Sequence, residues 1–349
     1  MRRDCGARFR ALGLALLLRF FTLRLAMANT PWKKSHDLSR LSAGFHRLRF
    51  TAAGGVGFDA FIWRGGPGPV LLVNGATHGD EYEGPTLLRT WAERWRPRRL
   101  AGTVVFVPVL NEAAFFAGQR CAPVDGANLA RVFPGQANGS PTERLAHLFD
   151  TQLLAQCTHY ADLHSAGAAY HLKPWTGYVT HRGAINRTQR AMAACFDAFW
   201  VWAGPYLPGR TLSAAFARNI PAIYVECQGL GGVDAGDLRN LDRGLKNLLH
   251  WAGLTRGSAP RLRRQAVRIT RDVDEAHLQV HHPAPVDGLF VPLAALDRRV
   301  RRGDLLGRVL PLDGSDGHLV RAESTGRIIL IRRQRSVRRG DALFTLAPV

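Results

Sequence analysis

Lysine is almost absent from this chain of 349 residues, which contains 4 lysines against 43 arginines. The formal net charge of +20 is therefore carried by arginine, and it is spread along the whole length. The two densest basic clusters, residues 298–302 and 332–339, contain none of the aromatic residues that a platform for single-stranded nucleic acid needs. We interpret the charge as a solvated surface and expect no specific nucleic-acid partner, with salt-dependent binding of duplex DNA as the alternative.

Cysteines and long apolar runs are also scarce. The five cysteines are scattered without a CxxC pair, which indicates reduced thiols in a cytosolic-type compartment rather than a disulfide framework. Residues 1–28 imitate a secretory signal, but Arg19 and Arg24 interrupt the apolar run, and the eight uncharged residues before Arg19 are too few to span a bilayer. We expect a true start at Met27 or a disordered extension, and hence a cytoplasmic protein without a membrane span, with export as the alternative.

Strand-like and helix-like segments alternate between residues 45 and 255. An edge hairpin is predicted over residues 45–63. The predicted buried strands are 70–73, 104–107, 159–167 and 222–225, and the predicted helices are 85–95, 140–156, 185–199 and 237–251. This alternation indicates an α/β fold with a mixed, mostly parallel sheet flanked by helices on both faces.

From Arg261 onward no helical pattern appears, and short strands alternate with turns. The pattern VRRGDxL occurs twice, at 300–306 and 337–343, which predicts a small pseudo-symmetric all-β domain. We therefore expect an N-terminal extension over residues 1–28, a large α/β domain over 29–257 and a β-rich domain over 261–349.

The stretch 70–84, VLLVNGATHGDEYEG, places His78 and Glu81 three residues apart where a strand gives way to a helix. His164 and Glu226 stand at the ends of two later strands. Side chains at the carboxyl ends of parallel strands share one crevice. Two histidines and one glutamate form a zinc ligand set with an open position for water, and a second carboxylate is left for proton transfer. The loop of about two dozen residues after Asn111 exceeds ordinary connections, which indicates a function.

These stretches resemble the succinylglutamate desuccinylase/aspartoacylase family, whose members have a zinc carboxypeptidase-like fold. The resemblance extends over residues 45–255, and the C-terminal stretch is similar to the barrel-sandwich domain of many members. It implies one Zn²⁺ per chain, bound by His78, Glu81 and His164. The matching segments are HGDE, NEAAFFAGQR from Asn111, PVDGANLARVFPG from Pro123, DLHSAG and YVECQG.

The resemblance also implies roles for other residues. Glu226 matches the general base, Arg120 the residue that polarises the scissile carbonyl, and Arg131 the clamp for a substrate carboxylate. Asn128 falls where relatives carry a group that orients the first metal histidine. Relatives usually have asparagine at position 130, where this chain has alanine, so a polar contact to the substrate is missing.

The expected function is a zinc-dependent amidohydrolase that removes an N-acyl group from a small amino acid-like amine. Its partner would be a small-molecule N-acyl substrate, a linear amide or an ester. The alternatives are a zinc carboxypeptidase acting on short peptides and an inactive binding protein on the same fold. A biotinyl or lipoyl carrier role is excluded, because residues 261–349 contain no lysine and the corresponding hairpin tip reads AESTG, residues 322–326.

Overall fold

The computed structural model describes residues 37–196, 198, 200–257, 266–269 and 278–347. The predicted extension over residues 1–28 lies outside them. Every helix in the described part of the chain is too short or too polar to cross a membrane.

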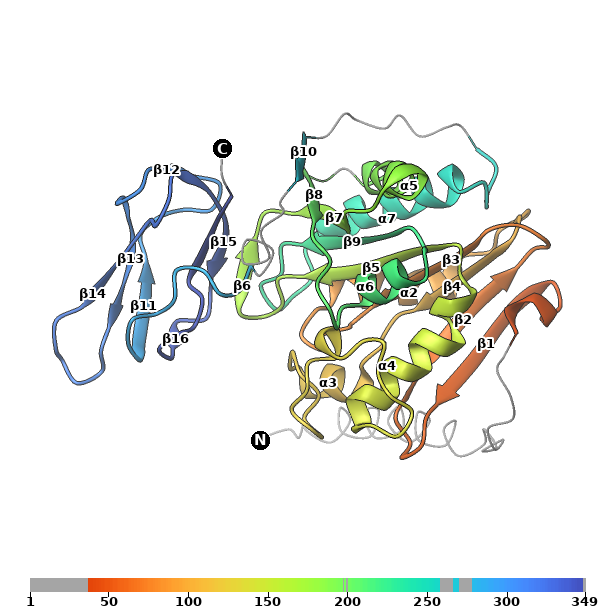
Figure 1. Cartoon of the computed structure of the whole chain (residues 1–349), viewed down its shortest axis with the longest axis horizontal. Coiled ribbons are helices and arrows are strands. Elements are labelled where there is room, and N and C mark those ends of the chain that lie inside the picture. The colour runs from red at the N-terminus through yellow and green to blue at the C-terminus, as the bar shows by residue number, and fades with distance from the viewer. Residues whose placement is uncertain (1–36, 197, 199, 258–265, 270–277, 348–349) are drawn as a thin grey trace, which may run out of the picture. The chain divides into compact units, whose positions relative to one another are not determined.

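A nine-stranded sheet forms the centre of the protein, with strand order β1-β2-β4-β3-β5-β9-β7-β8-β10 (Figure 1). Five of its eight neighbouring pairs are parallel, so the predicted mixed, mostly parallel sheet is confirmed. The hairpin of β1 and β2 lies at one edge, also as predicted. The strands are β1 Gly44–Thr51, β2 Gly57–Arg64, β3 Val70–Gly75, β4 Thr103–Val107, β5 His159–Ser165, β7 Trp175–Val179, β8 Trp200–Gly204, β9 Ala222–Cys227 and β10 Ala266–Ile269.

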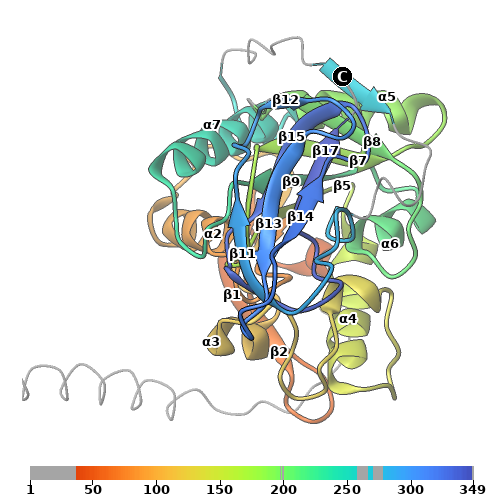
Figure 2. The same ribbon diagram turned by 90° about the vertical axis from the view of Figure 1, so that its left-hand side faces the viewer.

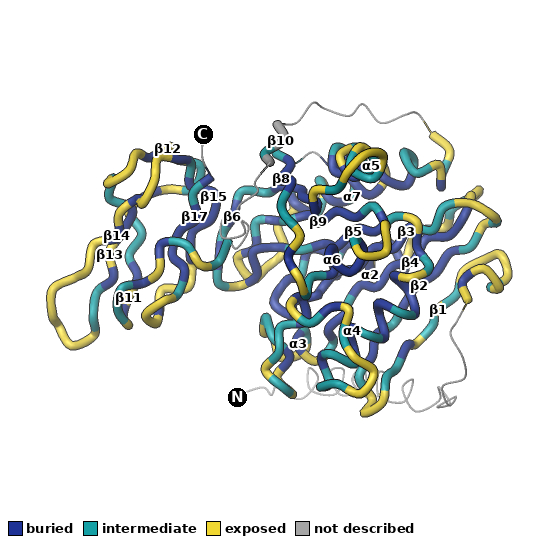
Figure 3. Tube along the Cα trace, in the orientation of Figure 1, coloured by how far each residue is buried: buried dark blue, intermediate teal, exposed yellow. Residues whose placement is uncertain are grey.

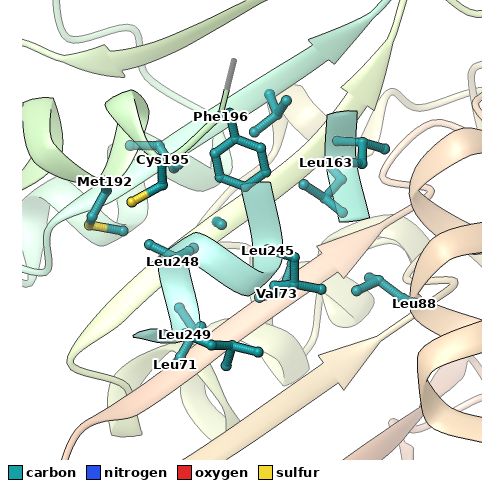
Figure 4. Close-up of a cluster of buried hydrophobic side chains, with 14 of the residues drawn as sticks. Leu71, Val73, Leu88, Leu163, Met192, Cys195, Phe196, Leu245, Leu248 and Leu249 are labelled. Atoms are coloured by element: carbon teal, nitrogen blue, oxygen red, sulfur yellow. The ribbon is translucent and has the colours of Figure 1, made fainter. Parts of the chain in front are cut away.

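Helices cover both faces of this sheet. Helices α2 (Glu83–Arg94), α5 (Gly183–Ala194) and α7 (Ala235–Trp251) pack on one face, and α4 (Pro141–Gln152) and α6 (Thr211–Ala217) pack on the other. Successive strand residues alternate between the faces, so Leu71 and Val73 pack with α7 whereas Leu72 packs with α4. Figure 4 shows the first cluster, where leucines of α7 meet β3 and α2, and Figure 3 shows the central strands buried. Because helices cover both faces of the sheet, the central strands contain continuous apolar runs.

The chain between Asn111 and Gly135 differs from the irregular stretch that the sequence predicted. It contains helix α3 (Glu112–Ala117), which is capped by the Asn111 side chain and ends at Gly118 with a φ of 61°. Short 3₁₀ turns occur in it at Leu129–Arg131 and elsewhere at Leu38–Arg40 and Leu154–Gln156. The prediction missed α3 because six residues are too few to show helical periodicity.

The chain from Gly288 to Ala347 forms two antiparallel sheets (Figure 2). Their strands are β11 Gly288–Pro292, β12 Arg299–Val300, β13 Leu305–Leu310, β14 His318–Arg321, β15 Gly326–Arg332, β16 Ser336–Val337 and β17 Phe344–Ala347. Strand β15 also pairs with β6 (Tyr170–Leu172), which comes from the preceding part of the chain. The domain boundary between residues 257 and 261 stays a prediction, because residues 258–265 lie outside the described part and β10 joins the large sheet.

The two copies of VRRGDxL form the same turn. In each copy the aspartate accepts a hydrogen bond of 2.9 Å from the backbone N–H three residues earlier, Arg301 in one and Arg338 in the other. The glycines before the aspartates both have a φ of 90°, a conformation that favours glycine. The repeated sequence therefore encodes a repeated turn, and the β-rich character predicted for this region is confirmed.

Candidate metal centre

Polar side chains extend from the carboxyl ends of three neighbouring strands. Asp162 and His164 lie two residues apart in β5 and so point to the same face, the one covered by α4 and α6. The parallel register places His164 beside Glu226 of β9 and Asp162 beside Asn74 of β3. The sheet thus brings together two of the four residues singled out for the metal chemistry.

The other two, His78 and Glu81, lie in the loop between β3 and α2. The loop turns sharply at Ala76, whose φ of 47° lies in a region that alanine rarely adopts. Next to His78, a Cβ on Gly79 would lie 2.0 Å from the carbonyl carbon of Ala114 in α3. Only glycine allows this close approach, which fixes the loop against α3.

The side chains of His78, Glu81 and His164 converge on one point. One ligand atom from each lies within 4.8 Å of the others. The Nδ1 atom of His78 is 2.7 Å from one Glu81 oxygen, and the Nδ1 atom of His164 is 2.9 Å from the other. On the far side of each ring, Nε2 lies 3.2 Å from Oδ1 of Asn128 and 2.9 Å from Oδ2 of Asp162, respectively.

This arrangement fits a divalent metal. When Nε2 of each histidine donates its hydrogen to the oxygen behind it, the Nδ1 lone pair points toward the space shared with the Glu81 carboxylate. Burial lowers the pKa of His78 to about 4, so this ring is neutral at pH 7. Burial also disfavours a charged His164, but Asp162 and Glu81 outweigh it and raise its pKa well above the usual value. Binding of a metal would therefore release a proton from His164.

Asp162 was not predicted as part of the site from the sequence. It is fully buried, and its carboxylate accepts hydrogen bonds from Asn74 (2.9 Å), Thr77 (3.1 Å) and Thr211 (2.6 Å) besides the contact with His164. Four partners leave the carboxylate no freedom to turn. The segment DLHSAG could have indicated it, because an aspartate two residues before a histidine in a strand points to the same face of the sheet as that histidine.

Glu226, Arg120 and Arg131 line a pocket of about 340 Å³ that also contains the three candidate ligands. Burial raises the pKa of Glu226 to about 8. Arg120 approaches the centre directly, with Nη1 3.3 Å from a Glu81 oxygen. The residues chosen for catalysis and those chosen for metal binding therefore share one cavity.

Asn128 lies behind His78 rather than in the pocket wall. Its Oδ1 atom accepts a hydrogen bond of 2.9 Å from the backbone N–H of Ala130 and is thereby fixed facing the histidine ring. The next residue, Arg131, donates from Nη1 to the carbonyl oxygen of Ala130 at 2.8 Å. Ala130 itself lines the pocket with its methyl group, so no side-chain amide reaches the cavity there.

The rest of the pocket wall is mostly apolar. Part of it comes from residues far along the chain, Leu278 and Val280 and then Leu330 of β15. Tyr178 also lines the pocket, whereas Trp175 is fully buried beside Trp202. The C-terminal part of the chain thus contributes to the wall of the cavity.

Three other histidines of the described residues lie outside the centre. The ring of His159 packs edge-on against Trp251 with centroids 5.6 Å apart. His171 contacts a glutamine side chain at 3.2 Å, and His181 packs against a phenylalanine ring at 4.6 Å. Arg210 lines the pocket but was not selected from the sequence, where nothing distinguishes it from 42 other arginines.

Comparison with known proteins points to one family. Residues 67–252 match the family model of the succinylglutamate desuccinylase/aspartoacylase catalytic domain. The chain is 31% identical over 304 residues to N-alpha-acetyl-L-2,4-diaminobutyric acid deacetylase from Halomonas elongata, a match that covers 86% of this chain and 88% of the relative.

Two solved structures are similar over most of the chain. The product-bound ectoine utilization protein EutE (DoeB) from Ruegeria pomeroyi has a TM-score of 0.78 and 29% identity, and the match covers 88% of this chain and 96% of that one. A succinylglutamate desuccinylase from Silicibacter sp. TM1040 has a TM-score of 0.81 and 26% identity, with coverages of 93% and 100%. The likeness therefore includes the C-terminal sheets as well as the catalytic region.

Proposed function

Because the chain belongs to the succinylglutamate desuccinylase/aspartoacylase family, we propose that it is a zinc-dependent hydrolase that removes the acyl group from a small N-acyl amino acid. One observation carries the proposal. The donor atoms of His78, Glu81 and His164 lie within 4.8 Å of one another, and Glu226 pairs with His164 on the adjacent strand. Hydrolysis by a metal-activated water requires residues that bind the metal and a nearby carboxylate that can accept a proton from the water.

The chemistry divides between the metal and the protein. Zinc bound by these three residues would polarise the acyl carbonyl, acidify a water molecule and, by its positive charge, favour the ionised form of Glu226. Glu226 then takes a proton from the attacking water and delivers it to the amine that leaves. The products are a carboxylate and a free amine.

Two arginines complete the proposed site. Arg120, held 3.3 Å from Glu81, donates to the carbonyl oxygen as it becomes negatively charged. Arg131 binds the carboxylate of the substrate, for which a planar guanidinium with paired N–H groups is suited. Asn128 keeps the His78 ring oriented through its contact with Nε2.

The shape of the pocket supports deacylation over the carboxypeptidase alternative. Its volume of about 340 Å³ is at the small end for ligand sites, and Leu278, Val280 and Leu330 form part of its wall. An acylated amino acid fits such a cavity, whereas a peptide chain needs an open groove.

A substrate panel tests the proposal. The zinc-loaded protein is assayed with N-acetyl, N-formyl and N-succinyl amino acids, with Nα-acetyl-2,4-diaminobutyric acid, on which a relative acts, with short peptides and with an ester. We expect release of amine from at least one acyl amino acid and slower cleavage of peptides. Faster cleavage of peptides would favour the carboxypeptidase, and no cleavage of any compound by stoichiometrically loaded protein would favour the inactive binding protein.

Glu226→Gln separates catalysis from metal binding. The amide cannot take a proton, so we expect kcat to fall by a factor of about 10² to 10⁴ while the zinc content stays at one per chain. Unchanged turnover would remove Glu226 from the mechanism.

A further inference from the structure

The pocket extends beyond the metal centre along the central sheet. Glu226 and Tyr224 lie two residues apart in β9, so they point to the same face of the sheet, and both line the pocket. Strands β7 and β8 are the next two strands, and Trp202 and Gly204 of β8 also line the pocket. Because neighbouring strands lie about 4.8 Å apart, the pocket reaches roughly 10 Å beyond the strand that contains the proposed base.

A glycine on the middle strand brings two aromatic side chains onto one surface. Gly177 of β7 is paired with Tyr224 on one side and with Trp202 on the other. A Cβ on Gly177 would lie 2.3 Å from the Cε1 and Cζ atoms of Tyr224, so the phenol ring occupies the space above the glycine. Since directly paired residues point to the same face, the two aromatic side chains lie side by side with only the glycine between their strands.

Trp202 is fixed in its position by other side chains. It is buried, and its ring lies 6.0 Å from the ring of Trp175, measured between centroids. The guanidinium of Arg268, on the neighbouring strand β10, lies 5.1 Å from the centroid of the Trp202 ring. Trp202 lines the pocket and Arg268 does not, so the surface that a ligand meets at this end is an aromatic ring.

Other apolar side chains complete this part of the pocket. Five of the residues that line the pocket belong to one hydrophobic cluster, namely Leu172, Trp202, Tyr224, Leu278 and Leu330. We call the space that these five residues bound the apolar compartment. Burial raises the pKa of Tyr224, so its phenol is uncharged at neutral pH. Among the described residues that line the pocket, none that comes from β7, from β8 or from residues 278–347 is charged.

These walls favour an uncharged, apolar group. An ammonium or a carboxylate in the apolar compartment would lose its hydration without gaining a charged partner, which is strongly unfavourable. Apolar surface, in contrast, is stabilised by leaving water. The pocket volume of about 340 Å³ lies within the range of sites for drug-sized ligands, so an acetylated amino acid backbone leaves room for a further group.

We propose that the apolar compartment binds an aromatic or branched aliphatic group of the substrate and that Trp202 forms its end wall. The preferred substrates are then N-acyl amino acids with such a group, rather than those with an acidic or an ammonium side chain. The group is either the side chain of the amino acid or the end of the acyl chain, and the same apolar walls recognise both. This inference rests on the proposed function, since it names the class of substrate for that site.

The test measures binding, so that it does not depend on turnover. Zinc-loaded Glu226→Gln protein is titrated, by ligand-observed NMR, with two pairs of probes that differ by one phenyl group. The first pair, N-acetylalanine and N-acetylphenylalanine, adds the phenyl group to the side chain. The second pair, N-acetylglycine and N-phenylacetylglycine, adds it to the acyl group. Nα-acetyl-2,4-diaminobutyric acid and N-acetylglutamic acid are the comparators with charged side chains.

Gly204 offers a position from which the apolar compartment can be filled. It lies two residues after Trp202 in β8, so it shares its face, and a Cβ there would meet only the Cδ1 atom of Trp202, at 3.9 Å. Gly204→Leu and the smaller Gly204→Ala therefore add apolar volume beside the indole without a clash. Gly66→Leu is the matched control, because Gly66 is also half-buried, has no atom within 4 Å of its Cβ position and does not line the pocket.

We expect the phenyl group to strengthen binding by about 10-fold or more in at least one pair, and that pair identifies the source of the apolar group. Both charged comparators should bind at least about 10-fold more weakly than the preferred phenyl compound. Gly204→Leu should remove the gain in affinity and Gly204→Ala should reduce it, whereas Gly66→Leu should leave it intact.

Several outcomes would overturn the proposal: no binding of any probe, no gain from the phenyl group in either pair, or tighter binding of a charged comparator. A gain that survives Gly204→Leu would also overturn it, because the phenyl group would then lie elsewhere. If the probes bind as expected but the wild-type protein cleaves none of them, the proposed function fails and the apolar compartment stands. If the wild type cleaves acyl amino acids but neither phenyl compound binds more tightly than its partner, the function stands and this inference fails.

Discussion

Replacing Asp162 by asparagine should weaken zinc binding about 10–100-fold, or about 1.4–2.7 kcal/mol, which is the usual effect of losing the partner behind a ligating histidine. The side chain keeps its size but exchanges one oxygen for an NH₂ group. In the structure one carboxylate oxygen faces Asn74 and Thr77, and the other faces Thr211 and His164.

Neither orientation of the new amide satisfies these partners. With NH₂ toward Asn74, two donors oppose each other in a fully buried position, which costs about 1–3 kcal/mol of stability. With NH₂ toward His164, the ring must carry its hydrogen on Nδ1 instead of Nε2, and Nδ1 is the atom that faces Glu81. In the first case the protein is destabilised and His164 keeps only a neutral oxygen in place of the carboxylate, and in the second case the ring presents the wrong tautomer, so zinc binding weakens in both cases.

Asp150→Asn is the matched control, because Asp150 is a buried aspartate of α4 that bonds Arg218 and touches none of the candidate ligands. Zinc affinity is measured by competition with a chelator, and the Tm of the metal-free proteins by circular dichroism. Both variants should have a lower Tm, but only Asp162→Asn should lose zinc affinity. If Asp162→Asn binds zinc like the wild type while its Tm falls as in the control, Asp162 has a structural role alone and the reasoning about the tautomer is refuted.

Three further outcomes are expected. Gly209→Ala would bring a Cβ to within 2.2 Å of the Arg131 carbonyl oxygen. Because this would displace Arg131, the proposed carboxylate clamp, the substitution should raise KM more than it lowers kcat. Kinetics that match the wild type would show that the segment at Gly209 can move away from the Arg131 segment freely. Removal of metal by a chelator should abolish turnover and zinc should restore it, whereas activity retained in metal-free protein would exclude the proposed mechanism. Asp297 pairs with Lys173 and Arg327, and although burial opposes it, these partners hold its pKa below the usual 3.8. Asp297→Asn should therefore lower the free energy of unfolding by up to about 1 kcal/mol above pH 3.8. Urea unfolding should show that this difference from the wild type disappears as the pH falls through the lowered pKa of Asp297. A difference that grew on acidification would contradict the assignment of the ion pairs.

The parts of the structure that the sequence predicted are those with a local signal. The predicted helix from residue 140 begins as expected, since Ser140 and Glu143 form a capping box around Pro141 at the first position. Strand β1, the outer strand of the predicted hairpin, shows the alternation of a half-buried edge. Such features depend on neighbours a few residues apart.

The strands that the prediction missed depend on distant partners. Strand β7 is buried at all five positions, so it shows no alternation of apolar and polar residues. Gly177, which lies against the ring of Tyr224, also interrupts its short run of strand-forming residues. It lies between β9 and β8, antiparallel to β9 and parallel to β8, a placement that no local pattern encodes. The place of Arg210 in the pocket was hidden for the same reason. It follows from the contact of Gly209 with Arg131 and of Thr211 with Asp162, residues that lie 78 and 49 positions apart in the chain.

The contribution of the C-terminal strands to the pocket also has a consequence for the order of events during synthesis. A nascent chain that has reached Glu226 already contains every residue proposed to hold the metal or transfer a proton, but Leu330 follows roughly a hundred residues later. At a translation rate of about 5–20 residues per second, this interval lasts several seconds. A nascent or truncated chain in that interval would have its reactive centre without the wall that limits what reaches it.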